Sequence, residues 1–320
     1  MSGGGRMDNE IKDVVMIGAG PSALTAAVYT TREDIDTVLY EKGVIGGMAA
    51  ITDKVDNYPG FPEGVEGLKL ADLLQKQAER FGAAIEFGEA STIRNEGDHK
   101  VVIIDGEEIK ARSVLIATGS DYNKVGVPGE QEFYGRGVHY CATCDGAFYR
   151  DKRLVTIGGG NSGFQEALFL TRFASHIDII VRSEIKASSI LQHEMQKFID
   201  EGKVTLHLNT DTKAIVGENN SVIGVDIVEG GEEKYIEVDG VFVFVGLKPN
   251  TGFLADTGIE LDELGLIKTN DHLETNMPGV FASGDVRSGA TMQIASAVGE
   301  GASAALSIRE YLDDLKRKRS

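Results

Sequence analysis

Residues 13–23 read Asp-Val-Val-Met-Ile-Gly-Ala-Gly-Pro-Ser-Ala. The apolar run Val14–Ile17 predicts a short buried β-strand, and the glycines directly after it predict a tight turn. An alanine-rich stretch that continues through Tyr29 predicts a helix. A strand, a glycine-rich turn and a helix in this order form the first part of a βαβ unit, which places its strands in a parallel sheet.

The residues that follow complete a dinucleotide-binding unit. Thr37–Tyr40 is rich in β-forming residues and ends at Glu41, about 20 residues after the glycine turn, where such a unit carries an acid. Gly18 permits the tight turn, Gly20 lets backbone N–H groups approach a pyrophosphate, and Ala23 allows the helix to pack closely on the strand. Glu41 is then placed to accept hydrogen bonds from a ribose diol.

A second unit of the same kind lies in the middle of the chain. The strand predicted at Leu154–Ile157 leads into Gly-Gly-Gly-Asn-Ser-Gly at 158–163. A helix through about Phe173 and a strand at Ile177–Val181 are predicted to follow. The chain therefore contains two complete dinucleotide-type units.

Each predicted unit continues into a β-rich stretch. Residues 85–116 contain a hairpin turn at Asp105-Gly106, and residues 204–245 contain one at Gly230-Gly231. Such self-similarity indicates two related domains. The sequence therefore predicts an α/β fold of two Rossmann-like dinucleotide-binding domains, each with three layers that include a β-meander.

The chain after Pro249 indicates a return to the first domain. It contains the run Phe281–Val286 and a helical stretch from about Gln293 to Leu312, but no third glycine-rich unit. We therefore expect the second domain to be inserted in the first. The expected boundaries assign residues 10–123 and 249–320 to the first domain and residues 124–248 to the second.

Composition narrows the class of protein and of partner. The 320 residues include 42% hydrophobic residues, enough for a sizeable core, and carry a formal net charge of -18. That charge repels phosphates and anionic lipids, so neither nucleic acid nor a membrane is an expected partner. The apolar runs are shorter than the roughly 18 residues of a membrane span, and no secretory signal opens the sequence. A cytoplasmic location is therefore expected.

The cysteines are the main chemical signal. Only two occur, Cys141 and Cys144, in the run Cys-Ala-Thr-Cys-Asp. Residues three apart share one face of a helical turn, so the two sulfurs can form a disulfide. The arrangement also favours a thiolate that attacks other disulfides. Asp145 lies beside the pair as a candidate acid and base.

Other interpretations of these residues are weaker. A zinc site needs two further ligands, and His139 is the only close histidine, so no metal is expected. A purely structural disulfide is unusual in the cytoplasm. For Asp145 the alternative is that it caps a turn, as aspartate often does.

Together these motifs resemble the low-molecular-weight thioredoxin reductases. The resemblance runs from about Asp13 to Leu312 and implies an FAD-dependent oxidoreductase that forms a homodimer and acts on a thioredoxin-like protein. Cys144 would face the flavin, Cys141 would attack the protein substrate, and Asp145 would transfer the proton. The other matching runs are Val55–Phe61, Ala117–Gly119, Gly246–Thr251 and Gly284–Val286.

The resemblance also implies the FAD contacts. The pyrophosphate would lie at the first glycine turn, the adenosine ribose at Glu41, and the flavin near a second glycine turn and the start of the last helix, whose N–H groups would face the pyrimidine edge. Asp285 would hold the ribityl chain or the phosphate side. The implied residues are Gly18, Gly20, Pro21, Ser22, Glu41, Lys42, Gly46, Gly47, Met48, Asn57, Ala117, Thr118, Gly119, Gly284, Asp285, Gln293 and Ile294.

The second unit departs from the family at the nucleotide. Members that use NADPH carry His-Arg-Arg, with another arginine further on, against the 2'-phosphate, whereas this chain has Val-Arg-Ser at 181–183, then Glu184 and Lys186. Loss of paired guanidinium groups disfavours NADPH. NADH, bound through Glu184, and a non-nicotinamide donor such as ferredoxin or a deazaflavin remain alternatives. The nicotinamide-site residues implied are Gly158, Gly160, Asn161, Ser162, Glu166 and Arg182.

Three further expectations follow. Met292 stands where the family usually has arginine, which can alter the flavin environment. Because one domain carries both the cysteines and the second nucleotide site, the two must reach a single flavin in turn, by rotation about hinges near Lys124 and Pro249. The alternative functions are a flavin-dependent dithiol oxidase, a peroxiredoxin-linked reductase, and a redox sensor without turnover.

Overall fold

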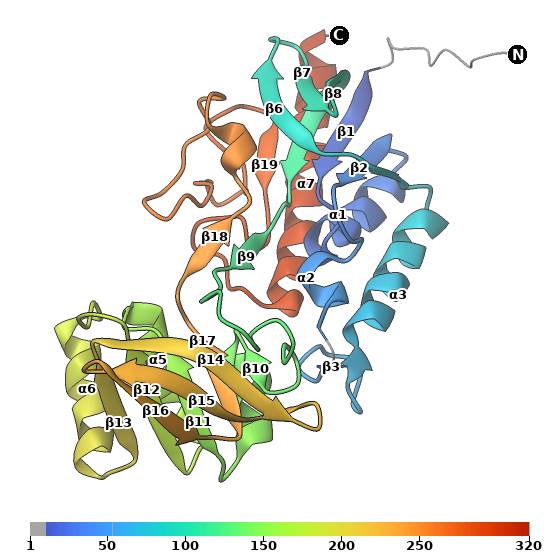
Figure 1. Ribbon diagram of the computed structural model, residues 1–320. Coiled ribbons are helices and arrows are strands. Elements are labelled where there is room, and N and C mark those ends of the chain that lie inside the picture. Colours follow the sequence, from blue (N-terminus) through green and yellow to red (C-terminus); the bar gives the residue numbers. More distant parts are fainter. Residues whose placement is uncertain (1–10, 53, 320) are drawn as a thin grey trace, which may run out of the picture. The chain divides into compact units, whose positions relative to one another are not determined.

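The computed structural model describes residues 11–52 and 54–319 (Figure 1). The chain divides into two compact units, one comprising the residues up to Asp121 and from Lys248 onward, the other Tyr122–Leu247. We call them unit 1 and unit 2. The structure therefore divides the units at 121/122 and 247/248. The boundaries expected from the sequence, 123/124 and 248/249, lie two residues and one residue later.

Unit 1 is built on a seven-stranded sheet in the order β5-β2-β1-β8-β7-β6, with β19 also paired to β8. Strand β8 connects a parallel part of the sheet to an antiparallel part. It runs parallel to β1 and β19 and antiparallel to β7. The parallel part is the dinucleotide-type sheet, and β6-β7-β8 is the meander. The strands are β1 (Lys12–Ile17), β2 (Thr37–Glu41), β5 (Ala84–Phe87), β6 (Ala90–Asn95), β7 (Lys100–Ile104), β8 (Glu107–Ile116) and β19 (Val280–Ala282).

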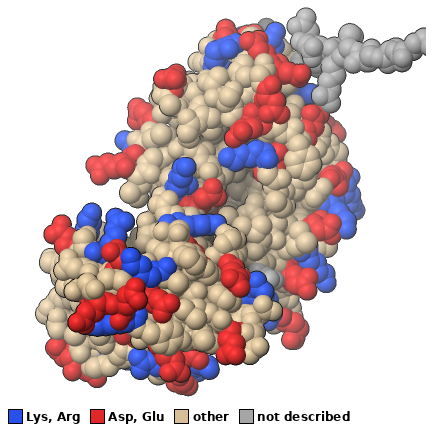
Figure 2. All heavy atoms as spheres, in the orientation of Figure 1, with Lys and Arg blue, Asp and Glu red and all other residues tan. Residues whose placement is uncertain are grey.

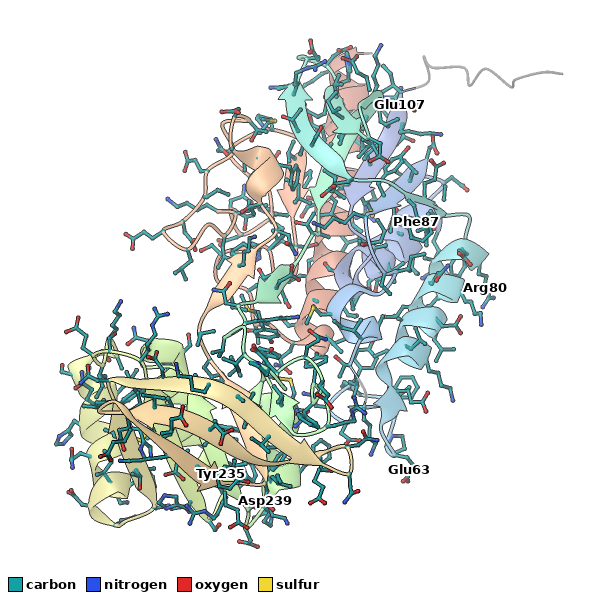
Figure 3. All side chains as sticks on the ribbon, viewed as in Figure 1. Glu63, Arg80, Phe87, Glu107, Tyr235 and Asp239 are labelled. Carbon is teal, nitrogen blue, oxygen red and sulfur yellow. A yellow bond between two sulfur atoms is a disulfide. The ribbon has the colours of Figure 1, made fainter. Side chains whose placement is uncertain are left out.

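Helices and loops cover the two faces of this sheet. One apolar cluster joins Leu24, Leu115 and Ile308, and another on the opposite face joins Ile116 and Ile267. At the sheet edge, Phe87 is 70% exposed and projects outward (Figure 3). The remaining elements of unit 1 are α1 (Pro21–Thr31), α2 (Gly47–Ala50), β3 (Lys54–Val55), β4 (Val65–Glu66), α3 (Gly67–Arg80), η2 (Gly252–Leu254) and α7 (Ile294–Arg319).

Unit 2 repeats the design with a five-stranded parallel sheet in the order β10-β17-β11-β12-β13 and a separate antiparallel sheet β14-β15-β16. Its parallel strands are β10 (Val138–His139), β11 (Arg153–Ile157), β12 (His176–Val181), β13 (Val204–Leu208) and β17 (Gly240–Val243). Its other elements are α4 (Ala142–Asp145), η1 (Gly146–Tyr149), α5 (Asn161–Leu170), α6 (Ser189–Asp200), β14 (Thr210–Glu218), β15 (Ser221–Glu229) and β16 (Glu232–Glu237).

The two segments that connect the units are short strands. They are β9 (Ser120–Tyr122) and β18 (Leu247–Pro249), which pair with each other in a two-stranded sheet. Each is preceded by a glycine with positive φ, Gly119 at 65° and Gly246 at 104°.

The predicted fold class is confirmed, and so are the hairpin turns at Asp105-Gly106 and Gly230-Gly231, which join β7 to β8 and β15 to β16. Two helix ends differ from the prediction. Helix α5 ends at Leu170 rather than near Phe173, since the chain tightens there and Phe173 N–H donates to the Leu170 carbonyl. Helix α7 continues past Leu312 to Arg319, because its charged tail is made of good helix formers.

One face of the molecule carries charges of both signs. On the face shown in Figure 2, acidic and basic side chains lie interspersed. Among the described residues no helix is both long enough and apolar enough to span a bilayer.

Candidate functional site

The first glycine turn is held against the neighbouring strand. Gly18 has φ 99°, and a Cβ on it would lie 2.5 Å from the Ala117 carbonyl oxygen, so a larger residue does not fit. Gly20 is the N-cap of α1 and has no side-chain cap, and a Cβ at Gly20 would meet no atom within 4 Å. No side chain therefore covers the start of α1, where the Ser22 N–H lies, and this is a fit for the pyrophosphate of FAD.

Glu41 is fixed at the end of β2. Its Oε2 accepts from the Ala19 N–H at 2.8 Å, and its Oε1 accepts from the Gly43 N–H at 2.7 Å. A carboxylate has about four acceptor sites, so lone pairs remain for a ribose diol. Lys42, the next residue, is exposed and pairs with Glu89 at 3.6 Å.

Asp285 has an incomplete set of partners. Its Oδ1 is buried without a hydrogen-bond partner among the described residues. Burial raises the pKa of Asp285 to about 6, and the Glu300 carboxylate adds to the rise. Glu300 is itself held by the Gly284 N–H at 2.8 Å and by Arg287. A buried orphan oxygen needs a donor, and the hydroxyls of a ribityl chain are donors of that kind.

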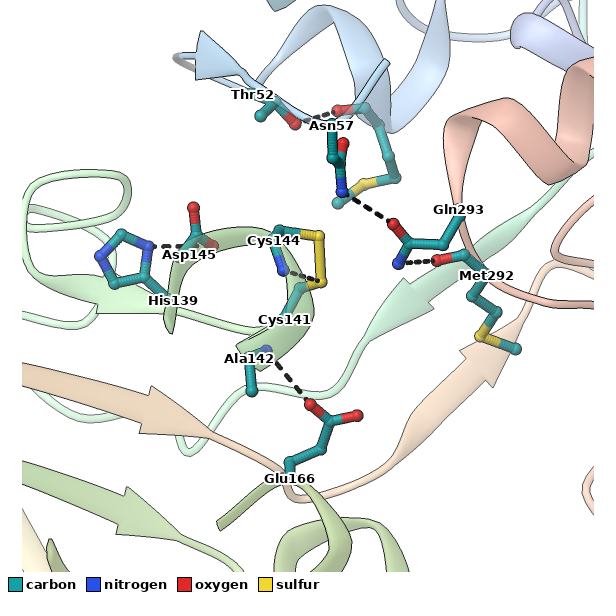
Figure 4. The surroundings of a disulfide bond; sticks show 11 residues. Thr52, Asn57, His139, Cys141, Ala142, Cys144, Asp145, Glu166, Met292 and Gln293 are labelled. Carbon is teal, nitrogen blue, oxygen red and sulfur yellow. Dashed lines mark hydrogen bonds and ion pairs between the residues drawn. A yellow bond between two sulfur atoms is a disulfide. The ribbon is translucent and has the colours of Figure 1, made fainter. Parts of the chain in front are cut away.

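The residues expected near the flavin come from distant parts of unit 1. Asn57 Nδ2 donates to Gln293 Oε1 at 3.0 Å, directly before α7 begins at Ile294 (Figure 4). Gly46 and Gly47 both have positive φ, and α2 begins at Gly47.

Two more residues that were expected near the cofactor form hydrogen bonds within unit 1. The Met48 carbonyl accepts from Thr52. Thr118, between Ala117 and Gly119, exchanges hydrogen bonds with Asn250.

Unit 2 has a second turn of the same design. Gly158 has φ 143°, and a Cβ on it would lie 2.3 Å from the Phe244 carbonyl oxygen. A Cβ at Gly160 would meet nothing within 4 Å, and α5 begins at Asn161 without a side-chain cap at its N-terminus. Asn161 Oδ1 accepts from the Ser188 N–H at 2.8 Å. Ser162 is exposed.

The two units differ at the end of the second strand. In unit 1 the turn N–H of Gly18 donates to Tyr40, and the next residue is Glu41. In unit 2 the N–H of Gly158 donates to Ile180, and the next residue is Val181. Val181 therefore occupies the position of the ribose-binding acid. Arg182 and Glu184, which follow it, are exposed.

The two cysteines are bonded to each other, with S–S 2.08 Å and Cα–Cα 5.3 Å. Cys141 is the N-cap of α4 rather than part of it, and the Cys144 N–H donates to Cys141 Sγ at 3.1 Å (Figure 4). Both cysteines are partly exposed. An N–H aimed at Cys141 Sγ stabilises a thiolate there, which favours Cys141 as the nucleophile.

Side chains around the disulfide complete the site. Asp145 Oδ2 lies 3.2 Å from His139 Nδ1. Glu166 Oε2 accepts from the Ala142 N–H at 3.2 Å, and burial raises the pKa of Glu166. Within the described part of the chain, no group of three potential metal ligands occurs.

Residues 12–301 match the pyridine nucleotide-disulphide oxidoreductase family. The chain belongs to this family. It is 43% identical over 312 residues to a thioredoxin reductase of Bacillus subtilis, which covers 97% of each chain. The comparisons thus bear out the resemblance to thioredoxin reductases, and the chain is an FAD-dependent disulfide oxidoreductase. Family members of this kind bind FAD and a pyridine nucleotide.

Solved structures agree. A thioredoxin reductase from Streptococcus pyogenes has a TM-score of 0.90 at 38% identity and covers 96% of this chain and 99% of its own. A thioredoxin reductase from Lactococcus lactis, described as in the FR conformation, has a TM-score of 0.64 at 39% identity and covers 95% of this chain and 99% of its own. At nearly the same identity, the two solved structures thus match this chain to different extents.

Sequence reasoning missed several residues of this oxidoreductase. His139 was considered only as a metal ligand, and Tyr149 and Glu300 not at all. The signal for His139 was its place two residues before Cys141. Nothing in the local sequence marks Glu300, because its contact with Gly284 depends on how α7 packs.

Replacing Asp285 with Asn should change stability in a pH-dependent way. A carboxyl with a raised folded-state pKa stabilises the fold below its ordinary value of 3.8 and loses that contribution as the pH rises through about 6. D285N apoprotein should therefore exceed wild type by about 1–3 kcal/mol at pH 8 and show no such gain at pH 4. FAD should bind about tenfold more weakly, since a neutral amide replaces a charged acceptor.

Urea unfolding of the apoprotein at both pH values, with FAD titration by flavin fluorescence, measures these effects. The exposed D271N is the matched control and should resemble wild type. An equal stability change for D285N at pH 4 and pH 8 would contradict the assignment.

Proposed function

We propose that this chain is a thioredoxin-disulfide reductase in which electrons pass through FAD to the Cys141–Cys144 disulfide and from there to a thioredoxin-like protein. The observation that carries the proposal is the pair itself, with Cys141 Sγ accepting the Cys144 N–H at the start of α4. The thioredoxin reductases among its relatives support the choice of substrate.

The exchange with the partner needs only the two cysteines and a proton carrier. Cys141 Sγ, as a thiolate, attacks one sulfur of the partner disulfide, and the other partner sulfur leaves as a thiolate. Cys144 Sγ then attacks Cys141 Sγ, restores the Cys141–Cys144 bond and releases the second partner thiolate. Asp145 accepts the proton of the attacking thiol, and the two protons lost by the cysteines end on the partner.

The chain's residues hold the cofactor. The N–H groups of Gly20 and Ser22 would bind the pyrophosphate, Glu41 would accept hydrogen bonds from the ribose, and Asp285 would accept them from the ribityl side. Asn57 and Gln293, joined to each other, lie by the flavin. When bound, FAD supplies the two electrons that reduce the disulfide.

The electron donor is a pyridine nucleotide that the site selects only weakly. Val181 cannot accept a hydrogen bond from a ribose 2'-hydroxyl, and this removes the usual preference for NADH. A single exposed Arg182, opposed by Glu184, cannot form the paired clamp on a 2'-phosphate that favours NADPH. We therefore expect NADPH and NADH to differ by less than about tenfold, which corresponds to about 1.4 kcal/mol.

The units are proposed to rotate about β9 and β18 during turnover, so that the disulfide and the nucleotide reach the flavin in turn. Support comes from the glycines with positive φ before both strands and from the different TM-scores of two relatives of similar identity. We further propose that the protein is cytoplasmic and forms a homodimer. Sedimentation analysis tests the dimer, because it measures the mass of the assembly.

Cys144→Ser should trap the substrate. Without the resolving thiol, Cys141 forms a mixed disulfide that persists, and turnover with thioredoxin should fall to background. Cys141→Ser should also be inactive but trap nothing. Mass spectrometry under non-reducing conditions distinguishes the two, and capture of thioredoxin by Cys141→Ser instead would reverse the assigned roles.

Donor choice should respond to the residues after β12. Ser183→Arg restores a second guanidinium and should favour NADPH by tenfold or more, whereas Val181→Glu supplies the missing acid and should favour NADH. Anaerobic bleaching of the flavin by each nucleotide measures the preference, with dithiothreitol as the control for a working flavin–disulfide pair. Wild-type flavin that bleaches with dithiothreitol and with neither nucleotide would refute a nicotinamide donor.

Rotation should appear as more than one distance between the units. Fluorophores placed through non-natural residues at Leu264 in unit 1 and Ile190 in unit 2, both at least 70% exposed, avoid the cysteines. Single-molecule energy transfer should give two populations whose ratio changes on reduction. Labels at Leu264 and Phe87, both in unit 1, should give one. A single unchanging population for the first pair would exclude rotation.

A further inference from the structure

Three polar side chains form a row beside the redox pair. Asp145 Oδ2 lies 3.2 Å from His139 Nδ1, and His139 Nε2 lies 2.7 Å from the Tyr149 hydroxyl. The three come from successive elements, β10, α4 and η1, all in unit 2. One end of the row, Asp145, is the residue directly after Cys144.

The protons along this row follow from its chemistry. Burial raises the pKa of Tyr149, and the charges of Asp145 and Asp239 add to the rise, so the phenol keeps its proton and can donate it. A neutral imidazole has one donor and one acceptor nitrogen. With Nε2 accepting from Tyr149, the proton of His139 is on Nδ1 and is donated to the Asp145 carboxylate.

The packing leaves the histidine little freedom. His139 is 8% exposed, and its ring contacts Phe242 and Tyr149 with centroids 5.1 Å and 5.3 Å away. The Tyr149 ring lies over Gly240, where an added Cβ would approach it to 2.5 Å. A glycine at that position of β17 thus makes room for the tyrosine. Asp145, with its side chain 21% exposed, directly follows Cys144 in the chain.

We propose that His139 is a positioning residue for the proposed exchange reaction: it holds the Asp145 carboxylate in a fixed orientation beside the cysteines, and Tyr149 fixes the imidazole in the required tautomer. This rests on the proposed function for Asp145 as the proton carrier. His139 exchanges no electrons and touches no substrate. Its Nδ1–H is the donor that the Asp145 carboxylate loses when His139 is replaced.

In the exchange step, Asp145 moves one proton and the sulfur atoms exchange one bond. The attacking cysteine thiol loses its proton to Asp145, its sulfur forms a bond to one sulfur of the disulfide under attack, and the other sulfur leaves with the electron pair. Asp145 then returns the proton to a leaving thiolate or to water. Two further charged groups lie near the row, Asp239 next to β17 and Glu166 on α5 behind Ala142.

The test is the pH profile of disulfide exchange in four variants of the holoenzyme. The protein is reduced with dithiothreitol, desalted anaerobically and mixed with 4,4'-dithiodipyridine, a small disulfide whose released thione is measured by absorbance. His139→Phe should move the acid limb of the rate to higher pH by roughly one unit, the shift expected for the loss of one hydrogen bond to a carboxylate. Tyr149→Phe should move it by less.

His139→Asn is the rescue variant, because its side-chain amide can donate to Asp145 as Nδ1 does, and its acid limb should return toward that of wild type. His193→Phe removes an exposed histidine of α6 and should leave the profile unchanged. If His139 only fills space, His139→Phe would lower the rate equally at every pH, and equal effects of Phe and Asn would likewise overturn the proposal.

The small disulfide separates this proposal from the proposed function. Exchange with dithiodipyridine needs neither thioredoxin nor a nucleotide. A shifted limb in His139→Phe, together with no thioredoxin turnover in wild type, would support the role of His139 and refute the substrate. Normal thioredoxin turnover in wild type, together with an unshifted acid limb in His139→Phe, would support the substrate and refute the role of His139.

Discussion

The close approach of a glycine turn to the carbonyl of a neighbouring parallel strand is the constraint on which both units depend. At Gly18 the neighbour is Ala117, and at Gly158 it is Phe244. In each case a Cβ would collide with backbone, which side-chain motion cannot relieve. The contact fixes where the following helix begins, and hence where its N–H groups point. In unit 1, the Ala19 N–H within the turn holds Glu41 beside that point.

The two units share this geometry but have diverged in the side chains next to it. Unit 1 keeps an acid at the strand end, and Glu41 is tied down by two backbone N–H groups. Unit 2 has Val181 there, buried at 2% exposure. One backbone design thus carries a fixed strand-end carboxylate in one unit and lacks it in the other. Phosphate binding and nucleotide choice are separable, since the first uses backbone groups and the second uses side chains.

The redox pair is stabilised by its own unit. The N–H of Cys144, the carbonyl of Cys141 and the carboxylate of Glu166 hold the first turn of α4, while His139 and Tyr149 hold Asp145. Reduction therefore changes charge within a preformed hydrogen-bonded surrounding. Such a site needs little reorganisation when a thiolate forms, which is the condition for fast exchange.

The sequence by itself determined the elements whose signal is local. The glycine turns, the strand-end acid, the hairpins and the spacing of the cysteines follow from periodicity, turn chemistry and neighbouring residues, and so does the α/β fold of two Rossmann-like units. Tertiary structure decided what depends on residues far apart in the chain. Asp285, whose orphan oxygen is buried, lies near the charge of Glu300 on α7. The hydrogen bond from Asn57 to Gln293 joins two segments more than 200 residues apart. His139 lies close to the cysteines in sequence, yet its role depends on a Tyr149 ring seated over Gly240 of β17. Burial and partners are properties of the folded core, because each residue's environment is supplied mainly by residues that are not its neighbours along the chain.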